Sequence, residues 1–258
     1  MTKLSYRLSI LLAATSLLGT AHAQPTATDP LFTAAPESLQ PQQVRSLQQR
    51  LSDWPQLAYY REQNARLPAP RKGEARVVFY GDSITEGWGR TVSESFFPGK
   101  GYLNRGISGQ TTAQMLLRFR QDVIALHPAV VVILAGTNDI AGNTGPASQA
   151  MIEDNLHSMV ELAQAHGIKV VLSSVLPVSA YRWRPGLQPA ASVRALNAAL
   201  KGYAEQQRLV YLDYHAALGN ADGGLDKALA EDGVHPTPAG YAKMAPLAEA
   251  AVAAALAH

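Results

Sequence analysis

The chain has 258 residues, of which 47% are hydrophobic and 16% are charged, and its formal net charge is +2. This length is enough for one large core, so we expect a single globular domain. The chain contains no cysteine, which excludes disulfides, a cysteine nucleophile and a thiolate metal site. The small net charge gives no indication of a nucleic-acid partner.

The first residues have the pattern of an export signal. Lys3 and Arg7 precede an apolar stretch (8–18), and the tripeptide "AHA", ending at Ala23, fits a cleavage site. The apolar stretch is short for a membrane span, so we expect no integral membrane segment in the mature chain. We therefore predict that residues 1–23 are a signal peptide and that the mature protein is periplasmic or secreted. Its removal would lower the net charge from +2 to zero, because it carries two basic residues and no acidic one.

Residues 24–70 are predicted to be a leader followed by N-terminal helices. Apolar residues recur three and four positions apart, as on one face of a helix: Val44, Leu47, Leu51 and Trp54. Ser52 or Asp53, followed by Pro55, indicates the start of a second helix. We expect these helices to pack on the main body, residues 71–258.

The main body alternates between two kinds of segment. Four segments are short, apolar and rich in β-branched residues, without alternation of polar residues, which is typical of parallel strands buried on both faces. A fifth segment (101–108) shows this pattern more weakly. Longer segments with helical spacing lie between them. The alternation predicts a three-layer α/β/α sandwich around a five-stranded parallel sheet. The expected strands are 75–81, 101–108, 129–136, 169–176 and 208–214, and the expected helices are 111–126, 147–166, 190–207 and 238–256.

Polar residues follow the ends of three of these strands. Asp82 and Ser83 come after the first, Gly109 lies just beyond the second, and Asn138 follows the third. Because the carboxyl ends of parallel strands meet at one edge of the sheet, we expect these residues to form a site there.

Ser83 permits two interpretations that are compatible. The sequence "SITE" (83–86) is a capping-box pattern, which makes Ser83 a helix cap. A hydroxyl between a strand and a helix also lies beside free N–H groups and the positive end of the helix dipole. That position suits a nucleophile whose reaction passes through an anionic intermediate.

A serine nucleophile needs a base. His235 lies in a Gly/Pro loop before the last helix, and Asp232 stands three residues earlier, a spacing at which the carboxylate can reach one ring nitrogen and leave the other free. The structural alternative is that the loop is only a turn. His215, after the last strand, remains a second candidate, whereas surface or capping positions are expected for the other histidines of the mature chain, which are His127, His157, His166 and His258.

Asn138 and Gly109 are candidates for an oxyanion hole, which is usually built from backbone N–H groups and an amide side chain. Each also has a structural explanation, since Asn138 could close its strand with an Asx turn and Gly109 could serve turn geometry. Their expected convergence at neighbouring strand ends favours the functional interpretation.

Four segments resemble, in order, the four sequence blocks of the SGNH (GDSL-type) hydrolase family: "VVFYGDSITEGWG", "NRGISGQTT", "VVVILAGTNDI" and "DGVHPTPAGY". The resemblance covers roughly residues 75–250. It implies a flavodoxin-like α/β/α fold and the activity of a serine ester hydrolase that needs no metal or cofactor. The first block reads GDSI instead of GDSL, at a position expected to be apolar packing.

The resemblance also implies residue roles. Ser83 would be the nucleophile, with His235 as base and Asp232 orienting it. The oxyanion donors would be the N–H of Gly109, with Gly106 as the less favoured alternative, and the side-chain amide of Asn138.

The natural substrate is less constrained. Three aromatic residues, Trp88, Tyr181 and Trp183, could stack on a sugar, and Arg182 could bond to it, although surface packing is their structural alternative. They favour removal of a short acyl group, such as acetyl, from a carbohydrate or small ester. A lipase, lysophospholipase or thioesterase acting on longer acyl chains is the alternative.

Two other classes of function could use parts of this pattern. A non-catalytic carbohydrate-binding module on this fold is disfavoured because every catalytic position is present. A metal-dependent phosphoesterase would use Asp82, Asp139, Asp232 and His235, but no recognisable ligand motif such as H-E-x-x-H accompanies them.

Overall fold

The structure is a computed structural model that describes residues 34–89 and 96–257. The predicted signal peptide, residues 1–23, lies outside the described residues.

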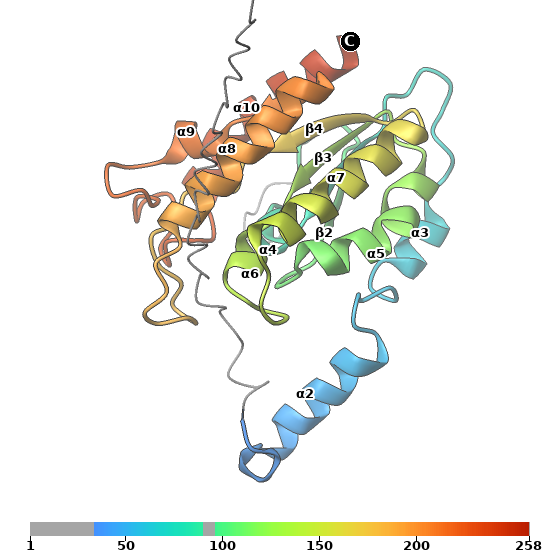
Figure 1. Cartoon of the computed structure of the whole chain (residues 1–258). Coiled ribbons are helices and arrows are strands. Elements are labelled where there is room, and N and C mark those ends of the chain that lie inside the picture. The colour runs from blue at the N-terminus through green and yellow to red at the C-terminus, as the bar shows by residue number, and fades with distance from the viewer. Residues whose placement is uncertain (1–33, 90–95, 258) are drawn as a thin grey trace, which may run out of the picture.

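A five-stranded sheet forms the centre of the molecule (Figure 1). All neighbouring strands pair in parallel, in the order β2-β1-β3-β4-β5. This arrangement confirms the predicted fold class. The strands are β1 (Val77–Gly81), β2 (Leu103–Gly106), β3 (Val130–Leu134), β4 (Lys169–Ser173) and β5 (Val210–Leu212).

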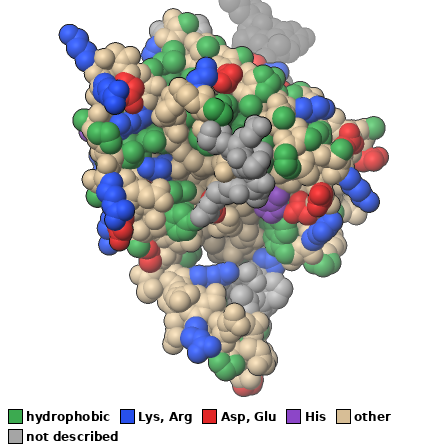
Figure 2. Space-filling model, turned by 180° about the vertical axis from the view of Figure 1, so that it is seen from behind, with side chains coloured by type: hydrophobic (Ala, Val, Ile, Leu, Met, Phe, Trp, Pro, Cys, Tyr) green, Lys and Arg blue, Asp and Glu red, His purple; other side chains and the backbone are tan. Residues whose placement is uncertain are grey.

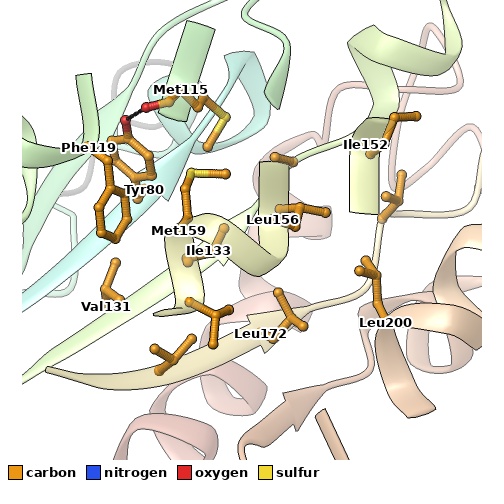
Figure 3. Close-up of a cluster of buried hydrophobic side chains, with 14 of the residues drawn as sticks. Tyr80, Met115, Phe119, Val131, Ile133, Ile152, Leu156, Met159, Leu172 and Leu200 are labelled. Atoms are coloured by element: carbon orange, nitrogen blue, oxygen red, sulfur yellow. Dashed lines mark hydrogen bonds between the residues drawn. The ribbon is translucent and has the colours of Figure 1, made fainter. Parts of the chain in front are cut away.

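The longer helices lie on both faces of the sheet, as a parallel sheet with crossover connections requires. On one face, α5 (Thr112–Asp122), α7 (Gln149–Ala165) and α8 (Ala190–Gln207) cover the strands. Figure 3 shows this core, in which Phe119 of α5 lies beside Tyr80 and Met159 of α7 lies beside Ile133. Burial of these apolar side chains fixes the register of the sheet.

The other face is covered mainly by α10 (Pro238–Ala257), with the short helices α4 (Ser83–Gly87) and α9 (Tyr214–Leu218) at the strand ends. Tyr241, Met244 and Val252 of α10 belong to one buried apolar cluster with Phe79 of β1 and Val132 of β3. Two further short elements, α6 (Thr137–Ile140) and the 3-10 helix η2 (Ile124–Leu126), flank β3. Because β1 and β3 pair with each other in parallel, the loops after them lie side by side.

The N-terminal region differs from the prediction. The expected first helix exists as α2 (Pro41–Ser52), preceded by the 3-10 helix η1 (Pro36–Ser38), but none of its residues is buried and it projects from the body (Figure 1). The second helix, α3 (Arg61–Arg66), begins later than expected. The Asp53 carboxylate accepts hydrogen bonds from the N–H groups of Leu57 (2.8 Å) and Ala58 (2.9 Å), so it closes a turn instead of starting a helix.

Candidate active site

Ser83 is the first residue of α4, two residues after the end of β1, at the carboxyl edge of the sheet. The cap of α4 is Asp82, whose carboxylate accepts a hydrogen bond from the N–H of Ile84 at 2.9 Å. The expectation that Ser83 caps the helix is therefore wrong: Ser83 is the first helical residue. An acid at the cap leaves the serine hydroxyl available for another partner.

The partner of the Ser83 hydroxyl is His235, 152 residues further along the chain. Ser83 Oγ lies 2.9 Å from His235 Nε2, and His235 Nδ1 lies 2.6 Å from Asp232 Oδ2. The other carboxylate oxygen, Oδ1, accepts hydrogen bonds from the N–H groups of Val234 (2.9 Å) and His235 (2.8 Å). The structure thus brings together a hydroxyl, an imidazole and a carboxylate in the order that proton transfer needs.

The carboxylate of Asp232 is stabilised in its ionised form. Burial by itself raises the pKa of Asp232, but the hydrogen bonds from His235 and from the N–H of Val234 outweigh burial and hold the pKa below its ordinary value. An ionised Asp232 keeps the proton of the neutral imidazole on Nδ1, which leaves Nε2 as the acceptor facing Ser83.

The two glycines considered for the oxyanion hole have different environments. Gly109 lines the cleft above Ser83, has a left-handed φ of +77°, and faces open space. Gly106 lies in β2, and its N–H donates to Asn104 Oδ1 at 2.9 Å. An added Cβ on Gly106 would lie 2.1 Å from the backbone nitrogen of Glu86. Gly106 therefore serves close packing of β2 against α4, and Gly109 is the better-placed donor.

Asn138 lies in α6, directly after β3, and lines the same cleft. Its side-chain nitrogen donates to the Gln110 carbonyl at 3.0 Å and to Asp82 Oδ2 at a longer 3.3 Å, and its oxygen accepts from Asn143 at 2.7 Å. Both amide hydrogens thus have acceptors. An oxyanion above Ser83 would compete for the hydrogen of the longer, weaker bond to Asp82.

Two buried acids support this edge of the sheet. Burial raises the pKa of Asp82 to about 6 and that of Asp139 to about 7. Asp139 accepts hydrogen bonds from the N–H of Thr112 at 3.1 and 3.0 Å and from its hydroxyl at 2.6 Å, which ties α6 to the start of α5. Neither acid lines the cleft.

The cleft has a volume of about 1210 Å³, and Figure 2 shows the molecule hollowed between its body and the N-terminal protrusion. Ser83 and His235 lie in it, together with Gly109 and Asn138. One wall of the cleft is formed by the N-terminal region, for which the sequence indicates no role. That wall consists of Ser46, Leu47, Gln49, Arg50, Leu51, Asp53, Trp54, Gln56, Ala58 and Tyr59.

Of the three aromatic residues predicted to bind substrate, only Trp183 lies at the cleft. It is 39% exposed, its ring centroid is 6.2 Å from that of His235, and its Nε1 donates to Asn143 Oδ1 at 3.1 Å. Trp88 and Tyr181 are buried and do not line the cleft. Trp88 packs in a cluster of aromatic rings with Phe79, Phe96, Phe97 and Tyr241.

Tyr181 instead hydrogen-bonds to Thr137, the first residue of α6. Arg182 donates to the Glu231 carbonyl at 2.8 Å, next to Asp232. His215, the second candidate base, lies outside the cleft.

The alternative of a metal-dependent phosphoesterase fits the geometry poorly. Asp82 and Asp139 are buried apart from the cleft, while Asp232 and His235 pair with each other. Across residues 34–89 and 96–257, no group of three or more histidine or acidic side chains is placed to hold a metal ion. In the same part of the chain, no helix has the length and apolar character to cross a membrane.

Comparisons with known proteins show the family of the chain. Residues 79–243 match the model of the GDSL-like lipase/acylhydrolase family. The crystal structure of a provisionally named acylhydrolase from Bacteroides fragilis is 48% identical, with a TM-score of 0.76, and the match covers 79% of this chain and 99% of that chain.

Two curated relatives are more distant. A lipoprotein of Bacillus subtilis, YqeF, is 32% identical over 42% of this chain and 51% of its own length. An acetylxylan esterase of Xylanibacter ruminicola is 28% identical over 72% of this chain and 45% of its own length. The chain thus spans about half the length of these two relatives. The family match covers more than half of the chain and includes every strand-end residue described above, and the chain therefore belongs to the GDSL-like lipase/acylhydrolase family.

Proposed function

We propose that this protein is a serine esterase that works through an acyl-enzyme and that its natural substrates are short-chain, chiefly acetyl, esters of carbohydrates. The observation that carries the proposal is the chain of contacts from Ser83 Oγ to His235 Nε2 (2.9 Å) and from His235 Nδ1 to Asp232 (2.6 Å) in an open cleft. Family membership and the esterase relative support it.

The proposed first step is attack of Ser83 Oγ on the ester carbonyl carbon. His235 Nε2 accepts the hydroxyl proton, and the carboxylate of Asp232 stabilises the resulting imidazolium without taking its proton. The carbonyl π electrons move to oxygen, so a tetrahedral oxyanion forms.

The oxyanion would be held by two N–H groups and one amide. Ser83 is the first residue of α4, so its N–H has no intrahelical acceptor, and Gly109 faces the cleft. Asn138 would exchange its 3.3 Å bond to Asp82 for a charge-assisted bond to the oxyanion. Donors fixed before the reaction stabilise the developing charge without reorganisation.

Collapse of the intermediate breaks the bond to the leaving alcohol. His235 returns the proton to the alcohol oxygen, which leaves an acyl group on Ser83. Water, deprotonated by the same imidazole, then attacks the acyl-enzyme and releases the acid.

A hydroxyl-rich substrate is supported by the polar side chains among the cleft lining, which include Ser46, Gln49, Arg50, Gln56, Asn143 and Thr144. Leu47, Leu51 and aromatic rings add apolar surface to the same cleft, as the rings of a sugar or a short acyl group require. Trp54 and Trp183 line the same cleft and are partly exposed, as expected for aromatic faces that stack on sugar rings. The relative from Xylanibacter ruminicola is named an acetylxylan esterase, which supports a carbohydrate ester.

We also propose that the chain is exported, with residues 1–23 as its signal peptide, 24–70 as an N-terminal extension and 71–258 as the hydrolase domain. The lipoprotein relative is consistent with export. Mass spectrometry of the protein expressed in a bacterium and recovered outside the cytoplasm tests this proposal: a mature N-terminus at Gln24 supports it, and retention of Met1 contradicts it.

The experiment for the activity measures initial rates on p-nitrophenyl acetate, butyrate and octanoate and acetate release from acetylated xylo-oligosaccharides, for the wild type and Ser83→Ala. We expect acetate activity that falls with chain length and is lost in the variant. Preference for octanoate would move the substrate class to lipids or long-chain thioesters. Equal rates in both proteins would refute the nucleophile.

A further inference from the structure

The loop that carries the predicted oxyanion donor Gly109 is held by a segment far away in sequence. We call residues 106–110 the oxyanion loop and residues 53–60, between α2 and α3, the docking turn. The docking turn lies outside the region that matches the family model. Three independent sets of contacts connect the two segments.

Glutamine amides make the first set of contacts. Gln110 Nε2 donates to the Pro55 carbonyl and to Gln56 Oε1, both at 3.0 Å. Gln114 donates to the Trp54 carbonyl at 2.6 Å and Gln121 to the Leu57 carbonyl at 2.8 Å. Three backbone carbonyls of the docking turn thus accept hydrogen bonds from glutamine side chains of the oxyanion loop and α5.

Glu86 makes the second connection. It is three residues after Ser83 in α4, and it is only 7% exposed. One carboxylate oxygen accepts a hydrogen bond from the Tyr59 hydroxyl, and the other accepts from the N–H (2.8 Å) and the hydroxyl of Ser108. Because Ser108 directly precedes Gly109, Glu86 fixes the peptide that precedes the predicted donor.

Tyr60 makes the third connection. Its ring is buried, its hydroxyl donates to the carbonyl of Gly106, and the Arg105 guanidinium lies 4.7 Å from the ring centroid. The docking turn therefore contacts the first residue of the oxyanion loop, Gly106, and the last, Gln110, directly, and it contacts Ser108 through Glu86.

The network reaches both sides of the predicted oxyanion hole through Gln110. Its side-chain oxygen accepts from Arg118 Nε at 2.5 Å, and its backbone carbonyl accepts from Asn138 Nδ2 at 3.0 Å. Arg118 is fully buried and also donates to the carbonyl of Gly81 at 3.0 Å, two residues before Ser83. One hydrogen-bonded network thus contacts the segments that carry Ser83, Gly109 and Asn138.

We propose that the docking turn is part of the working active site: Tyr59, Tyr60 and Glu86 are positioning residues that hold the oxyanion loop so that the Gly109 N–H points at the developing oxyanion. This inference rests on the proposed function, since it assumes that Gly109 donates in the transition state. Small displacements of a catalytic donor cost large factors in rate, so loss of one tether should lower turnover without weakening substrate binding.

The test compares Tyr59→Phe and Glu86→Gln with the wild type, using Tyr211→Phe as the matched control. Tyr211 likewise has a hydroxyl that donates one hydrogen bond, to the Asn197 carbonyl at 3.2 Å, but it lies in β5, away from the cleft. We expect kcat on p-nitrophenyl acetate to fall about tenfold in Tyr59→Phe and roughly 10- to 100-fold in Glu86→Gln, with KM changed less than about twofold. Tyr211→Phe should retain the wild-type kcat.

A second readout separates positioning from a structural role. An alkylboronic acid forms a tetrahedral adduct with the active serine, and its inhibition constant should rise by about the same factor by which kcat/KM falls. The double variant should lose less than the product of the two single losses, because Tyr59 and Glu86 act through one hydrogen bond. Tyr59 is 41% exposed, so its variant is expected to fold even where Glu86→Gln does not.

The inference is overturned when Tyr59→Phe keeps the wild-type kcat and boronate affinity, or when the loss appears wholly in KM. That result is distinguishable from failure of the proposed function. If Ser83→Ala is inactive while Tyr59→Phe and Glu86→Gln behave as the wild type, only the positioning role is wrong. If Ser83→Ala remains active, the esterase mechanism itself is wrong.

Discussion

The candidate site has two halves that are held in very different ways. The acid–base half, Asp232 and His235, lies on a loop, with side chains that are 30% and 41% exposed. The Asp232 carboxylate is held by N–H groups of its own loop and by the His235 ring. The oxyanion half contains the side chains of Asn138 and Asp82, both 3% exposed or less, and its hydrogen bonds join separate elements of the fold.

Because the two halves are held differently, substitutions in the exposed half should lower activity without lowering stability, whereas substitutions in the buried half should lower both. Removal of an exposed group that has few partners outside its own loop leaves few buried groups unsatisfied, whereas removal of a buried group leaves donors and acceptors without partners. The two halves also respond to pH in opposite directions, because the pKa of Asp232 is lowered while those of Asp82 and Asp139 are raised. Four predictions test this comparison.

The largest effect is expected in the exposed half. His235→Ala removes the base for both acylation and deacylation, so we expect kcat to fall on the order of 10⁴-fold or more, with a thermal midpoint near that of the wild type. Stopped-flow or long-time assays with p-nitrophenyl acetate, together with a melting curve by circular dichroism, measure both quantities. A variant that is inactive because it is unfolded would contradict the separation of activity from stability.

Asn138→Ala should lower both activity and stability. Loss of one oxyanion donor costs on the order of 10²–10³-fold in kcat. The buried Gln110 carbonyl also loses a hydrogen bond, which should reduce the free energy of unfolding by about 1–3 kcal/mol. Rates and urea denaturation curves give the two values. Near-full activity in this variant would show that Asn138 is not an oxyanion donor.

The free energy of unfolding should fall as pH rises through the range in which the buried acid Asp139 loses its proton. The pKa of Asp139 in the folded protein is about 7, above its ordinary value of 3.8, so the folded state binds more protons between these values. Stability from this group is therefore lost as pH rises from about 4 to 7, by a total of a few kcal/mol, and is level above 7. Asp139→Asn should make this fall shallower.

Urea denaturation at pH 5 and pH 7.5 measures the effect. Asp232→Asn is the control, because the lowered pKa of Asp232 contributes stability that is lost only on acidification below about 4, so this variant should leave the difference between pH 5 and pH 7.5 unchanged. A slope unchanged by Asp139→Asn would show that Asp139 is ionised in the folded protein at pH 5.

The smallest effect is expected at the rim of the cleft. Trp183→Ala removes an aromatic face next to His235, so KM for acetylated xylo-oligosaccharides should rise roughly three- to tenfold. On p-nitrophenyl acetate, which lacks a sugar, KM should change little. An equal change on both substrates would assign Trp183 to support of Asn143 and the oxyanion half instead of to sugar binding.

The sequence predicted those parts of the site that carry a local signal. Ser83 and Asn138 directly follow apolar strands, and Asp232 and His235 share one short loop, so each could be found from its immediate neighbours. The parallel sheet then brings them together. Asp82 as the cap of α4 was missed because the pattern "SITE" offered a capping box one residue later.

Tertiary partners were not predictable. Trp88 and Trp183 are the same residue type in loop-like contexts, yet the first packs among aromatic rings and the second borders the cleft. Glu86 looked like the acid of a capping box, but its carboxylate bonds to Tyr59 and Ser108. Nothing near Tyr59 in the sequence indicates such a contact, because the two segments meet only when the chain folds.

The most direct test of the central claim, that Ser83 is a nucleophile activated by His235, is covalent labelling with a p-nitrophenyl phosphonate ester followed by peptide mass spectrometry. We predict one phosphonyl group per chain, located on Ser83, with the labelling rate reduced by orders of magnitude in His235→Ala. A label on another residue, or equal labelling of Ser83→Ala, would contradict the account.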